Sequence, residues 1–293
     1  FLAEIVKQIY RRFEGQEGLW SHYVEQDLLP RMHGFELLMA SYAMCHMKLD
    51  MLLTETGYKP SNANNPPRLG VYLTNSLEEH HPETGQLFAQ FLSREANAAN
   101  DIKKNTPIMV AIGNPPYSGE SSNKGDWIMK EMEAYKREPS GGKLQEKNSK
   151  WINDDYVKFM RMGEYYIEKN GEGVLAYITN HSYLDNPTFR GVRYHLMQTF
   201  DDIYILDLHG NSLKKEISPD GTQDKNVFDI QQGVSIILEI KKQSKKSDLA
   251  KIYHFDLYGN RDEKFEWLRK NTISSPKIVE IKPVTPSYFF TPK

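Results

Sequence analysis

The apolar run 108–113 is followed at once by Asn114-Pro115-Pro116-Tyr117, and this stretch most constrains how the chain can fold. Proline has no N–H to give to a sheet ladder, so a strand here must end at Asn114. A residue that precedes proline is pushed into extended geometry, which stiffens the turn. Open α/β sheets bind ligands at the carboxyl ends of their strands. The stretch therefore predicts a buried strand that presents a rigid turn to a planar, amino-bearing ring.

Composition sets the class of protein. The 293 residues, 39% hydrophobic and 26% charged, are typical of a soluble chain with one large α/β domain or two smaller ones. The single cysteine, Cys45, excludes an internal disulfide and a cysteine-cluster metal site and predicts a reducing compartment. We expect no bound metal and, because no apolar run is long enough to cross a bilayer, no membrane association.

Charge bears on a nucleic-acid partner. The net charge is −2, whereas a self-sufficient DNA-binding domain usually carries a clear basic excess. Residues 241–251 hold five lysines against one aspartate, which favours a solvated turn over a phosphate contact. If the protein acts on DNA, we expect the phosphate contacts in a local patch or in another part of the polypeptide.

Strand and helix patterns alternate along the chain, which predicts a mostly parallel sheet with helices on both faces. The run 234–240 follows the strand 203–208 as a hairpin partner, so the last strand is expected to be antiparallel. The expected strands end near Glu36, Asn75, Asn114, Thr179, Leu208 and Ile240, and the expected helices cover 1–14, 37–53, 83–103, 151–169 and a segment that begins at Asn186-Pro187.

Polar residues at the expected strand ends are candidates for ligand binding. Glu36 stands between a strand and a Met- and Ala-rich helix, where an acidic residue can accept hydrogen bonds from both ribose hydroxyls of a nucleotide. An ordinary solvated glutamate explains the position equally well. Asn75 and Ser76 face the ligand crevice or form a local turn. The polar segment 118–150 either closes over a substrate or is a solvated loop.

The turn at 114–117 suits one kind of chemistry. An amino group on an aromatic ring is a poor nucleophile, because its lone pair is delocalised into the ring. The side-chain carbonyl of Asn114 and the backbone carbonyl of Pro115 can accept its two N–H bonds and draw electron density onto nitrogen. Tyr117 can stack on the ring, which is worth ~1–3 kcal/mol per base. A base in duplex DNA must first be flipped out of the stack.

Asn114-Pro115-Pro116-Tyr117 resembles the Asn/Asp-Pro-Pro-Tyr/Phe motif of S-adenosylmethionine-dependent amino methyltransferases, above all DNA adenine-N6 methyltransferases. Phe1-Leu2 resembles the end of the family's glycine-rich donor motif, so the resemblance implies that the first strand and the glycines lie upstream. The donor motif precedes the catalytic motif, which is the γ-type order. The resemblance implies a Rossmann-like methyltransferase fold.

The resemblance also assigns the donor side. Residues 34–36 are similar to the next donor motif, with Glu36 as the ribose ligand. Residues 74–77 are similar to Gly-Asp-Ser/Thr-Leu, with Asn75 in place of the usual aspartate, which weakens the expected contact to the donor's adenine. The implied residues that bind S-adenosylmethionine are Phe1, Glu36, Asn75, Ser76, Leu77 and Asn114.

The second half resembles the methylase module of large single-chain restriction-modification enzymes of the type ISP kind. Phe189 matches the second base-stacking aromatic by register, with Tyr183 as the alternative and a core position as the other explanation. Residues 207–212 and 232–236 resemble the late strands of these modules. The resemblance covers 1–245, a methyltransferase domain truncated at its N-terminus, and leaves 246–293 as the start of a linker toward a target-recognition domain.

The function implied is methylation of adenine N6 in double-stranded DNA, in the bacterial cytoplasm, as part of a restriction-modification system. The implied partners are further domains of the same polypeptide, among them a target-recognition domain; the sequence leaves open whether helicase and nuclease parts are attached. Three alternatives remain: a protein-glutamine methyltransferase, a cytosine-N4 methyltransferase, or a DNA-binding fragment that is inert in isolation.

Overall fold

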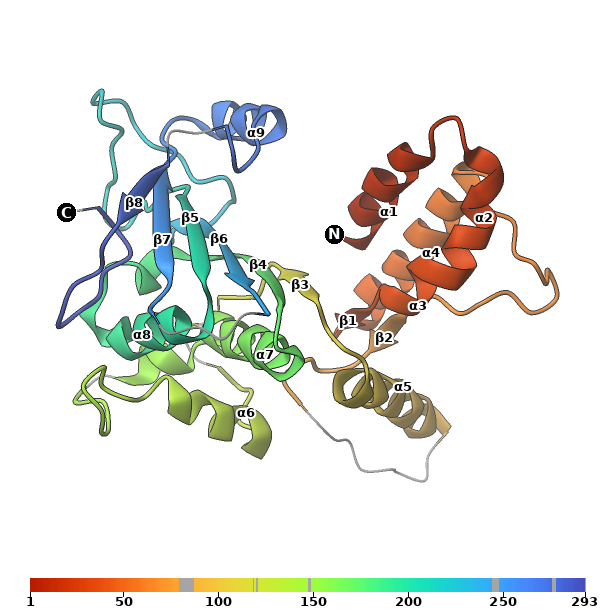
Figure 1. Ribbon diagram of the computed structural model, residues 1–293, viewed down its shortest axis with the longest axis horizontal. Coiled ribbons are helices and arrows are strands. Elements are labelled where there is room, and N and C mark those ends of the chain that lie inside the picture. Colours follow the sequence, from red (N-terminus) through yellow and green to blue (C-terminus); the bar gives the residue numbers. More distant parts are fainter. Residues whose placement is uncertain are drawn as a thin grey trace. The chain divides into compact units, whose positions relative to one another are not determined.

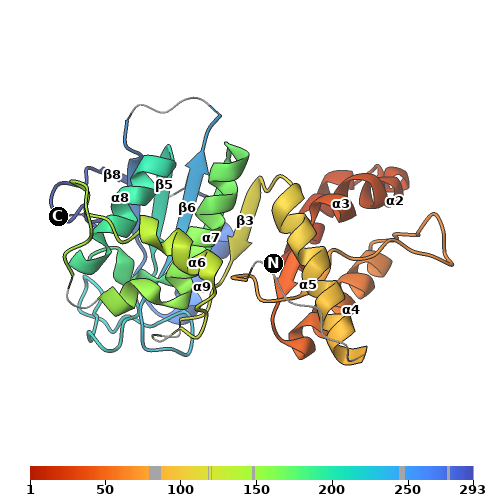
Figure 2. The same ribbon diagram turned by 90° about the horizontal axis from the view of Figure 1, so that it is seen from below.

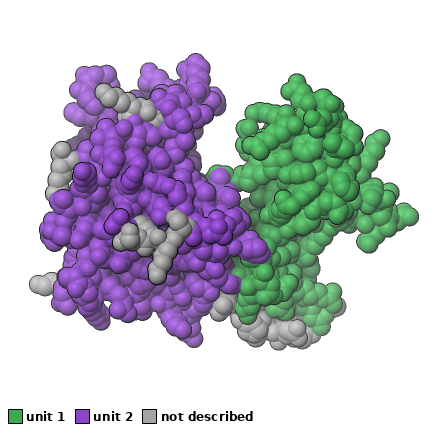
Figure 3. Space-filling view, in the orientation of Figure 1, with its two compact units in different colours: residues 1–106 green, residues 107–293 purple. Residues whose placement is uncertain are grey.

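The computed structural model describes residues 1–78, 87–117, 119, 121–146, 149–243, 248–275 and 278–292. It divides into two compact units, residues 1–106 and residues 107–293, coloured separately in Figure 3. The two units are described in turn.

The first unit is mainly helical. Its core joins Val6 of the first helix to Trp20, Val24 and Leu49, all of them buried. The helix expected over 1–14 is present as Leu2–Tyr10 with a short 3₁₀ turn after it, and Leu2, Ile5, Ile9 and Phe13 pack against this core. The helices are α1 (Leu2–Tyr10), α2 (Trp20–Tyr23), α3 (Leu29–Arg31), α4 (Met39–Glu55) and α5 (Leu87–Asn105) (Figure 1).

Two short strands of the first unit bring the candidate donor residues to one edge. Strand β1 (Gly34–Glu36) pairs in parallel with β2 (Val71–Leu73), so that Glu36 stands beside Leu73. The chain continues in the same direction beyond both strands, and the Thr74 amide donates to the Glu36 carbonyl at 2.8 Å. Residues that follow β1 and β2 therefore share one edge.

The second unit is built on a six-stranded sheet, in the order β3-β4-β6-β5-β7-β8. Strands β3, β4, β5 and β7 run in one direction, and β6 and β8 run antiparallel to their neighbours. The predicted hairpin partner of β5 is thus confirmed in β6, and the mixed sheet is Rossmann-like. The strands are β3 (Val110–Gly113), β4 (Gly173–Asn180), β5 (Asp202–Asp207), β6 (Val234–Lys241), β7 (Lys251–Asp256) and β8 (Val279–Ile281).

Helices cover both faces of this sheet (Figures 1 and 2). Helix α7 (Asp155–Asn170) packs on β4, where Gly163 leaves room for the Leu175 side chain. The strand register aligns Leu175 with Ile252, so the two side chains point to the same face of the sheet. Phe255 follows Ile252 by three residues and therefore points to the opposite face. Trp267 of α9 (Arg261–Lys270) stacks on Phe255 with ring centroids 5.3 Å apart. The unit also contains α6 (Asp126–Glu131) and α8 (Arg190–Thr199).

The prediction that the strand before Asn114 is buried is wrong. Strand β3 lies at the edge of the sheet, and Val110 and Ile112 in it are 61% and 44% exposed. An apolar run of strand length is equally compatible with a central strand and with an edge strand. The pattern of apolar residues indicates what packs on the two faces of a strand, but not whether a second strand pairs with its free side. Residues 108–109 also precede the strand instead of opening it.

The C-terminal residues add to the same layer, since β7 and β8 belong to the six-stranded sheet. The role of residues 246–293 as a connection to a target-recognition domain stays a prediction. Across the described ranges, no helix combines the length and the apolar composition that a bilayer crossing requires.

Candidate functional site

The Asn-Pro-Pro-Tyr turn follows directly from the carboxyl end of β3. Pro115 is buried, whereas Asn114 and Pro116 on either side of it are exposed. A buried ring with a fixed φ anchors the turn and leaves the Asn114 side chain open to a ligand. The structure therefore places one of the two predicted acceptor groups on a rigid, accessible corner.

Tyr117 turns back onto this corner. Its Oη lies 3.4 Å from Asn114 Oδ1 and 3.4 Å from the Ile178 carbonyl, and a single hydroxyl proton serves only one of them at a time. Its ring meets Tyr156 edge-on at 6.1 Å, and burial raises the pKa of the phenol, which stays a donor. The hydroxyl thus competes for the carbonyl oxygen that the sequence assigns to the target amine.

The chain after the turn is tied to the N-terminus of α7. The Gly119 amide donates to Asp154 at 3.1 Å, and the Ser121 hydroxyl donates to Asp155 at 2.6 Å. Lys158, also buried, donates to Ser121 Oγ at 2.8 Å. The start of the segment 118–150 is therefore docked, which neither sequence alternative anticipated; residues 118, 120, 147 and 148 lie outside the described ranges. The available signal was the pair of adjacent aspartates at the start of the helix, Asp154 and Asp155.

The two other predicted stacking residues lie in the core. Phe189 is 2% exposed, Tyr183 is fully buried, and the Tyr156 ring is 6.5 Å from each of them. The predicted start of a helical segment at Asn186-Pro187 is confirmed, because the Asn186 side chain accepts from the Thr188 amide at 3.0 Å and caps the turn that carries Phe189. Base stacking by Phe189 or Tyr183 stays a prediction, and it requires movement of residues 181–189.

On the donor side, Glu36 has one occupied oxygen. Its Oε1 accepts from the Leu38 amide at 2.9 Å, just before α4, and the other oxygen accepts no hydrogen bond from the described residues. Phe1, which precedes α1, is 58% exposed. Glu36 thus stabilises the start of α4 and still offers an acceptor to a ligand.

Asn75 forms the local turn that was the alternative to ligand binding. Its Oδ1 accepts from the Leu77 amide at 3.1 Å, and its Nδ2 donates to Glu78 at 2.9 Å. Ser76 is half-buried and Leu77 is buried. The structure therefore gathers residues 36 and 75–77 in the first unit, while residues 114–117, 183 and 189 belong to the second unit.

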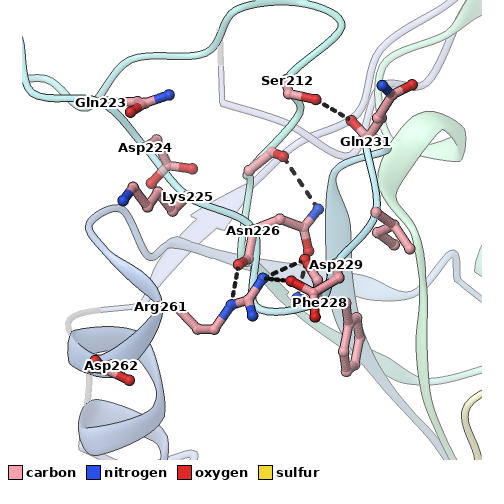
Figure 4. Close-up of a pocket in the computed structure, with 12 residues that line it drawn as sticks. Ser212, Gln223, Asp224, Lys225, Asn226, Phe228, Asp229, Gln231, Arg261 and Asp262 are labelled. Carbon is pink, nitrogen blue, oxygen red and sulfur yellow. Dashed lines mark hydrogen bonds and ion pairs between the residues drawn. The ribbon is translucent and has the colours of Figure 1, made fainter.

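The polar excursion 210–232 is a built structure with a cavity of about 600 Å³ (Figure 4). The Asn226 amide donates to the Gly210 carbonyl at 3.2 Å and to the Gln232 carbonyl at 2.6 Å, which closes the excursion at its base. Arg261 of α9 donates to the Asn226 carbonyl at 3.0 Å and pairs with Asp229 at 2.7 Å. This organisation was not evident from the polar sequence.

A family profile described as Eco57I restriction-modification methylase matches residues 44–213. The match includes the turn at 114–117 together with residues 75–77, 183 and 189. No curated protein shows significant sequence similarity to the chain.

Three solved structures are similar to the chain. The first is the ATP-dependent type ISP restriction-modification enzyme LlaBIII bound to DNA, with a TM-score of 0.79 and 22% identity, covering 99% of this chain and 19% of that chain. The second is a nuclease-deletion mutant of the type ISP restriction-modification enzyme LlaGI in complex with a DNA substrate mimic, with a TM-score of 0.78 and 19% identity, covering 99% of this chain and 23% of that chain. The third is a DrdV–DNA complex, with a TM-score of 0.71 and 22% identity, covering 92% of this chain and 25% of that chain. At these identities the likeness establishes a shared fold. The chain spans about a fifth to a quarter of the length of these proteins.

Proposed function

Because the chain belongs to the Eco57I restriction-modification methylase family, we propose that it methylates the N6 amino group of adenine in double-stranded DNA, with S-adenosylmethionine as the methyl donor. The observation that carries this proposal is the exposed amide of Asn114, held on a rigid corner by the buried Pro115. The proposed setting is a restriction-modification system in the bacterial cytoplasm, with target-recognition, helicase and nuclease parts in the same polypeptide.

The acceptor residues act by alignment and polarisation. The Asn114 side-chain carbonyl and the Pro115 backbone carbonyl accept the two N–H bonds of the flipped adenine, which localises the nitrogen lone pair. S-adenosylmethionine supplies a methyl group on a positively charged sulfur. The new N–C bond forms as the S–C bond breaks, and one N6 proton leaves to solvent. The rate gain comes from fixed geometry and preorganised dipoles, without a covalent enzyme intermediate.

Tyr117 has two positions in this scheme. In the structure its hydroxyl lies 3.4 Å from the Asn114 acceptor oxygen. Entry of the base displaces this long hydrogen bond, and the ring then stacks on the base. The hydroxyl therefore donates to the Asn114 oxygen until the base arrives. Loss of this hydrogen bond costs base binding little free energy, because a 3.4 Å hydrogen bond is weak.

The donor residues fit S-adenosylmethionine in part. Glu36 keeps one carboxylate oxygen for a ribose hydroxyl. Asn75 already donates to Glu78, so a hydrogen bond to the donor's adenine requires exchange of that partner. Ser76, Leu77 and the exposed Phe1 complete the proposed donor side.

Binding of DNA rests largely on other parts of the polypeptide in this proposal. The net charge of −2 gives little sequence-independent attraction to phosphates. The lysine-rich stretch 241–251 falls partly outside the described residues, at 244–247, so its phosphate contact stays a prediction.

Transfer of tritiated methyl groups to duplex DNA tests the proposal. The protein in its full natural length should label DNA, and hydrolysis should place the label on N6-methyladenine. Asn114→Ala should lower the rate roughly 100-fold or more, as loss of a preorganised polar group does. Asn62→Ala, in an exposed loop, is the matched control and should leave the rate unchanged.

Each contrary outcome has a distinct meaning. Equal labelling by Asn114→Ala contradicts the catalytic role of the turn. Label on cytosine N4 or on protein glutamine contradicts the substrate, and absence of label from the folded, full-length protein contradicts the activity itself.

A further inference from the structure

The described ranges contain three sets of histidine and carboxylate side chains that could hold a metal ion. Within each set, one ligand atom from each residue lies within 4.8 Å of the others. In one set Arg161 already pairs with Glu164 and Glu168. In another, both ring nitrogens of His254 are hydrogen-bonded, to the Phe290 carbonyl and to Asp256. The third set, His181, His209 and Glu216, is less fully paired. Asn211 Nδ2 lies 3.2 Å from His181 Nε2, and His209 Nδ1 lies 3.7 Å from Asp207 Oδ2. Glu216 accepts from the Asn211 amide through Oε2 at 2.7 Å, and its Oε1 faces His209.

The third set lies at the carboxyl ends of the parallel strands. His181 follows β4, and His209 and Glu216 follow β5. A ligand atom from each residue lies within 4.8 Å of the other two, and His209 Nδ1 is 3.9 Å from Glu216 Oε1. Ligand atoms around a tetrahedral zinc are ~3.4 Å apart, given Zn–N bonds of ~2.0–2.1 Å. Small side-chain movements would close the set around an ion.

Carboxylates hold the far side of each imidazole. His181 Nδ1 is 3.1 Å from Asp207 Oδ1, and His209 Nε2 is 2.8 Å from Asp256 Oδ1. A carboxylate on the second ring nitrogen fixes the tautomer and increases the basicity of the first nitrogen, as at metal-binding histidines. This leaves His181 Nε2 and His209 Nδ1 as the nitrogens that face the cluster.

The imidazoles are also held by close packing. A Cβ on Gly233 would come within 2.3 Å of the His181 ring, so only glycine allows this ring position. The His209 ring stacks on Tyr258 with centroids 3.9 Å apart. Both histidines are buried, which fixes the rings before any ligand binds.

We propose that His181, His209 and Glu216 form a binding site for one divalent transition-metal ion of the Zn²⁺ class. Imidazole and carboxylate ligands suit zinc, and Glu216 supplies the carboxylate while Asp207 and Asp256 hold the two imidazoles from behind. The ion joins the turn after β5 to the end of β4. It also fixes the start of the excursion 210–232, where Gly210 and Ser212 line the cavity of Figure 4.

Asn211 completes the site. Its Nδ2 is 3.2 Å from His181 Nε2, while its Oδ1 accepts from the Lys214 amide at 3.1 Å. Rotation of the amide by half a turn gives up the bond to Lys214 and presents Oδ1 beside His181 as a fourth ligand. The assignment of amide oxygen and nitrogen follows the hydrogen-bond network and changes with the occupant.

Protons compete with the metal for this cluster. Zinc binding should therefore release protons and strengthen as the pH rises.

Metal content and zinc titration test the proposal on the folded protein. After incubation with zinc chloride and removal of excess, elemental analysis should find one zinc per chain. Calorimetry in two buffers of different ionisation enthalpy should show proton release. His209→Ala should abolish binding, and Asp207→Asn should weaken it roughly 10- to 100-fold. His195→Gln, in the cluster with Glu164 and Glu168, is the matched control and should bind as the wild type does.

Glu216→Gln keeps the test sharp if His209→Ala does not fold, because the Glu216 side chain is 20% exposed and the change preserves its shape. It should lower zinc affinity at least tenfold and remove the zinc-dependent rise in melting temperature. Folded wild-type protein that retains no zinc, or Glu216→Gln that retains as much zinc as the wild type, overturns the proposal. Neither readout depends on methyl transfer, so it stands or falls separately from the proposed function.

Discussion

Glu239 should destabilise the second unit at neutral pH. It lies in β6, between Leu175 of β4 and Ile203 of β5, with both carboxylate oxygens buried and without a hydrogen-bond partner among the described residues. Burial raises the pKa of Glu239 well above the ordinary 4.5, and the nearby charge of Glu164 adds to the shift. The native state therefore keeps this carboxyl group protonated up to a higher pH than the unfolded state does.

The sign and size of the effect follow from linkage. A folded-state pKa above the unfolded value gives a stability contribution that is fully present below about pH 4.5 and is lost as the pH rises through the folded-state pKa. The loss is about 1.4 kcal/mol for each pH unit in that interval. Glutamine at position 239 does not titrate. The free energy of unfolding of Glu239→Gln should therefore rise relative to that of the wild type by about 1.4 kcal/mol for each pH unit in that interval.

Urea denaturation at several values from about pH 5 to about pH 8 measures the effect, because the difference between wild type and variant cancels all other titrating groups. Glu280→Gln, at an exposed position of β8, is the matched control and should show no pH-dependent difference. A wild-type–Glu239→Gln difference that is constant with pH would refute the reasoning.

Four further outcomes are expected. Arg193→Met should lower the free energy of unfolding by roughly 3 kcal/mol in urea melts, because the buried guanidinium donates to carbonyls of two distant segments, which are left unpaired. His195→Gln should cost most stability below pH 6.5, and less as the pH rises, because Glu164 outweighs burial and raises the pKa of His195; a cost that grows with pH would contradict this. Gly191→Ala should destabilise by roughly 1–3 kcal/mol in thermal melts, since its Cβ would meet a backbone oxygen at 2.4 Å, whereas Gly18→Ala, with nothing within 4 Å, should be neutral. Tyr117→Ala should lower methyl transfer roughly 5- to 150-fold through lost stacking, and Tyr117→Phe should retain it; equal loss in both would point to the hydroxyl instead.

The alternation of strands and helices was readable from local patterns. Periodicity located β4, β5 and β6, and the pairing of β6 with β5 was predicted from their succession along the chain. The cap at Asn186 was equally local, since an asparagine followed by proline at the first helical position needs no tertiary information. The edge position of β3 was not readable, because the identity of a ladder neighbour depends on chain segments distant in sequence.

The site was partly predictable for the same reason. Asn114 and Pro115 sit where the motif placed them, at the end of a strand. The burial of Phe189 depends on packing against Tyr156, which sequence spacing does not report. The convergence of His181 and His209 arises from the sheet order, in which β6 intervenes between β4 and β5, and no local motif records it.

Within the sheet that the structure describes, the edge position of β3 decides which elements support the Asn-Pro-Pro-Tyr turn. A central strand is held by two ladders, but within the described sheet β3 is held by β4 alone. The second anchor is the start of α7, through Asp154 and Asp155. A shift of about 1 Å in a reacting group can cost a hundredfold in rate. Substitution of Asp154 or Asp155, some forty residues from Asn114 in sequence, should therefore disturb the Asn-Pro-Pro-Tyr turn as much as substitution of a residue beside it.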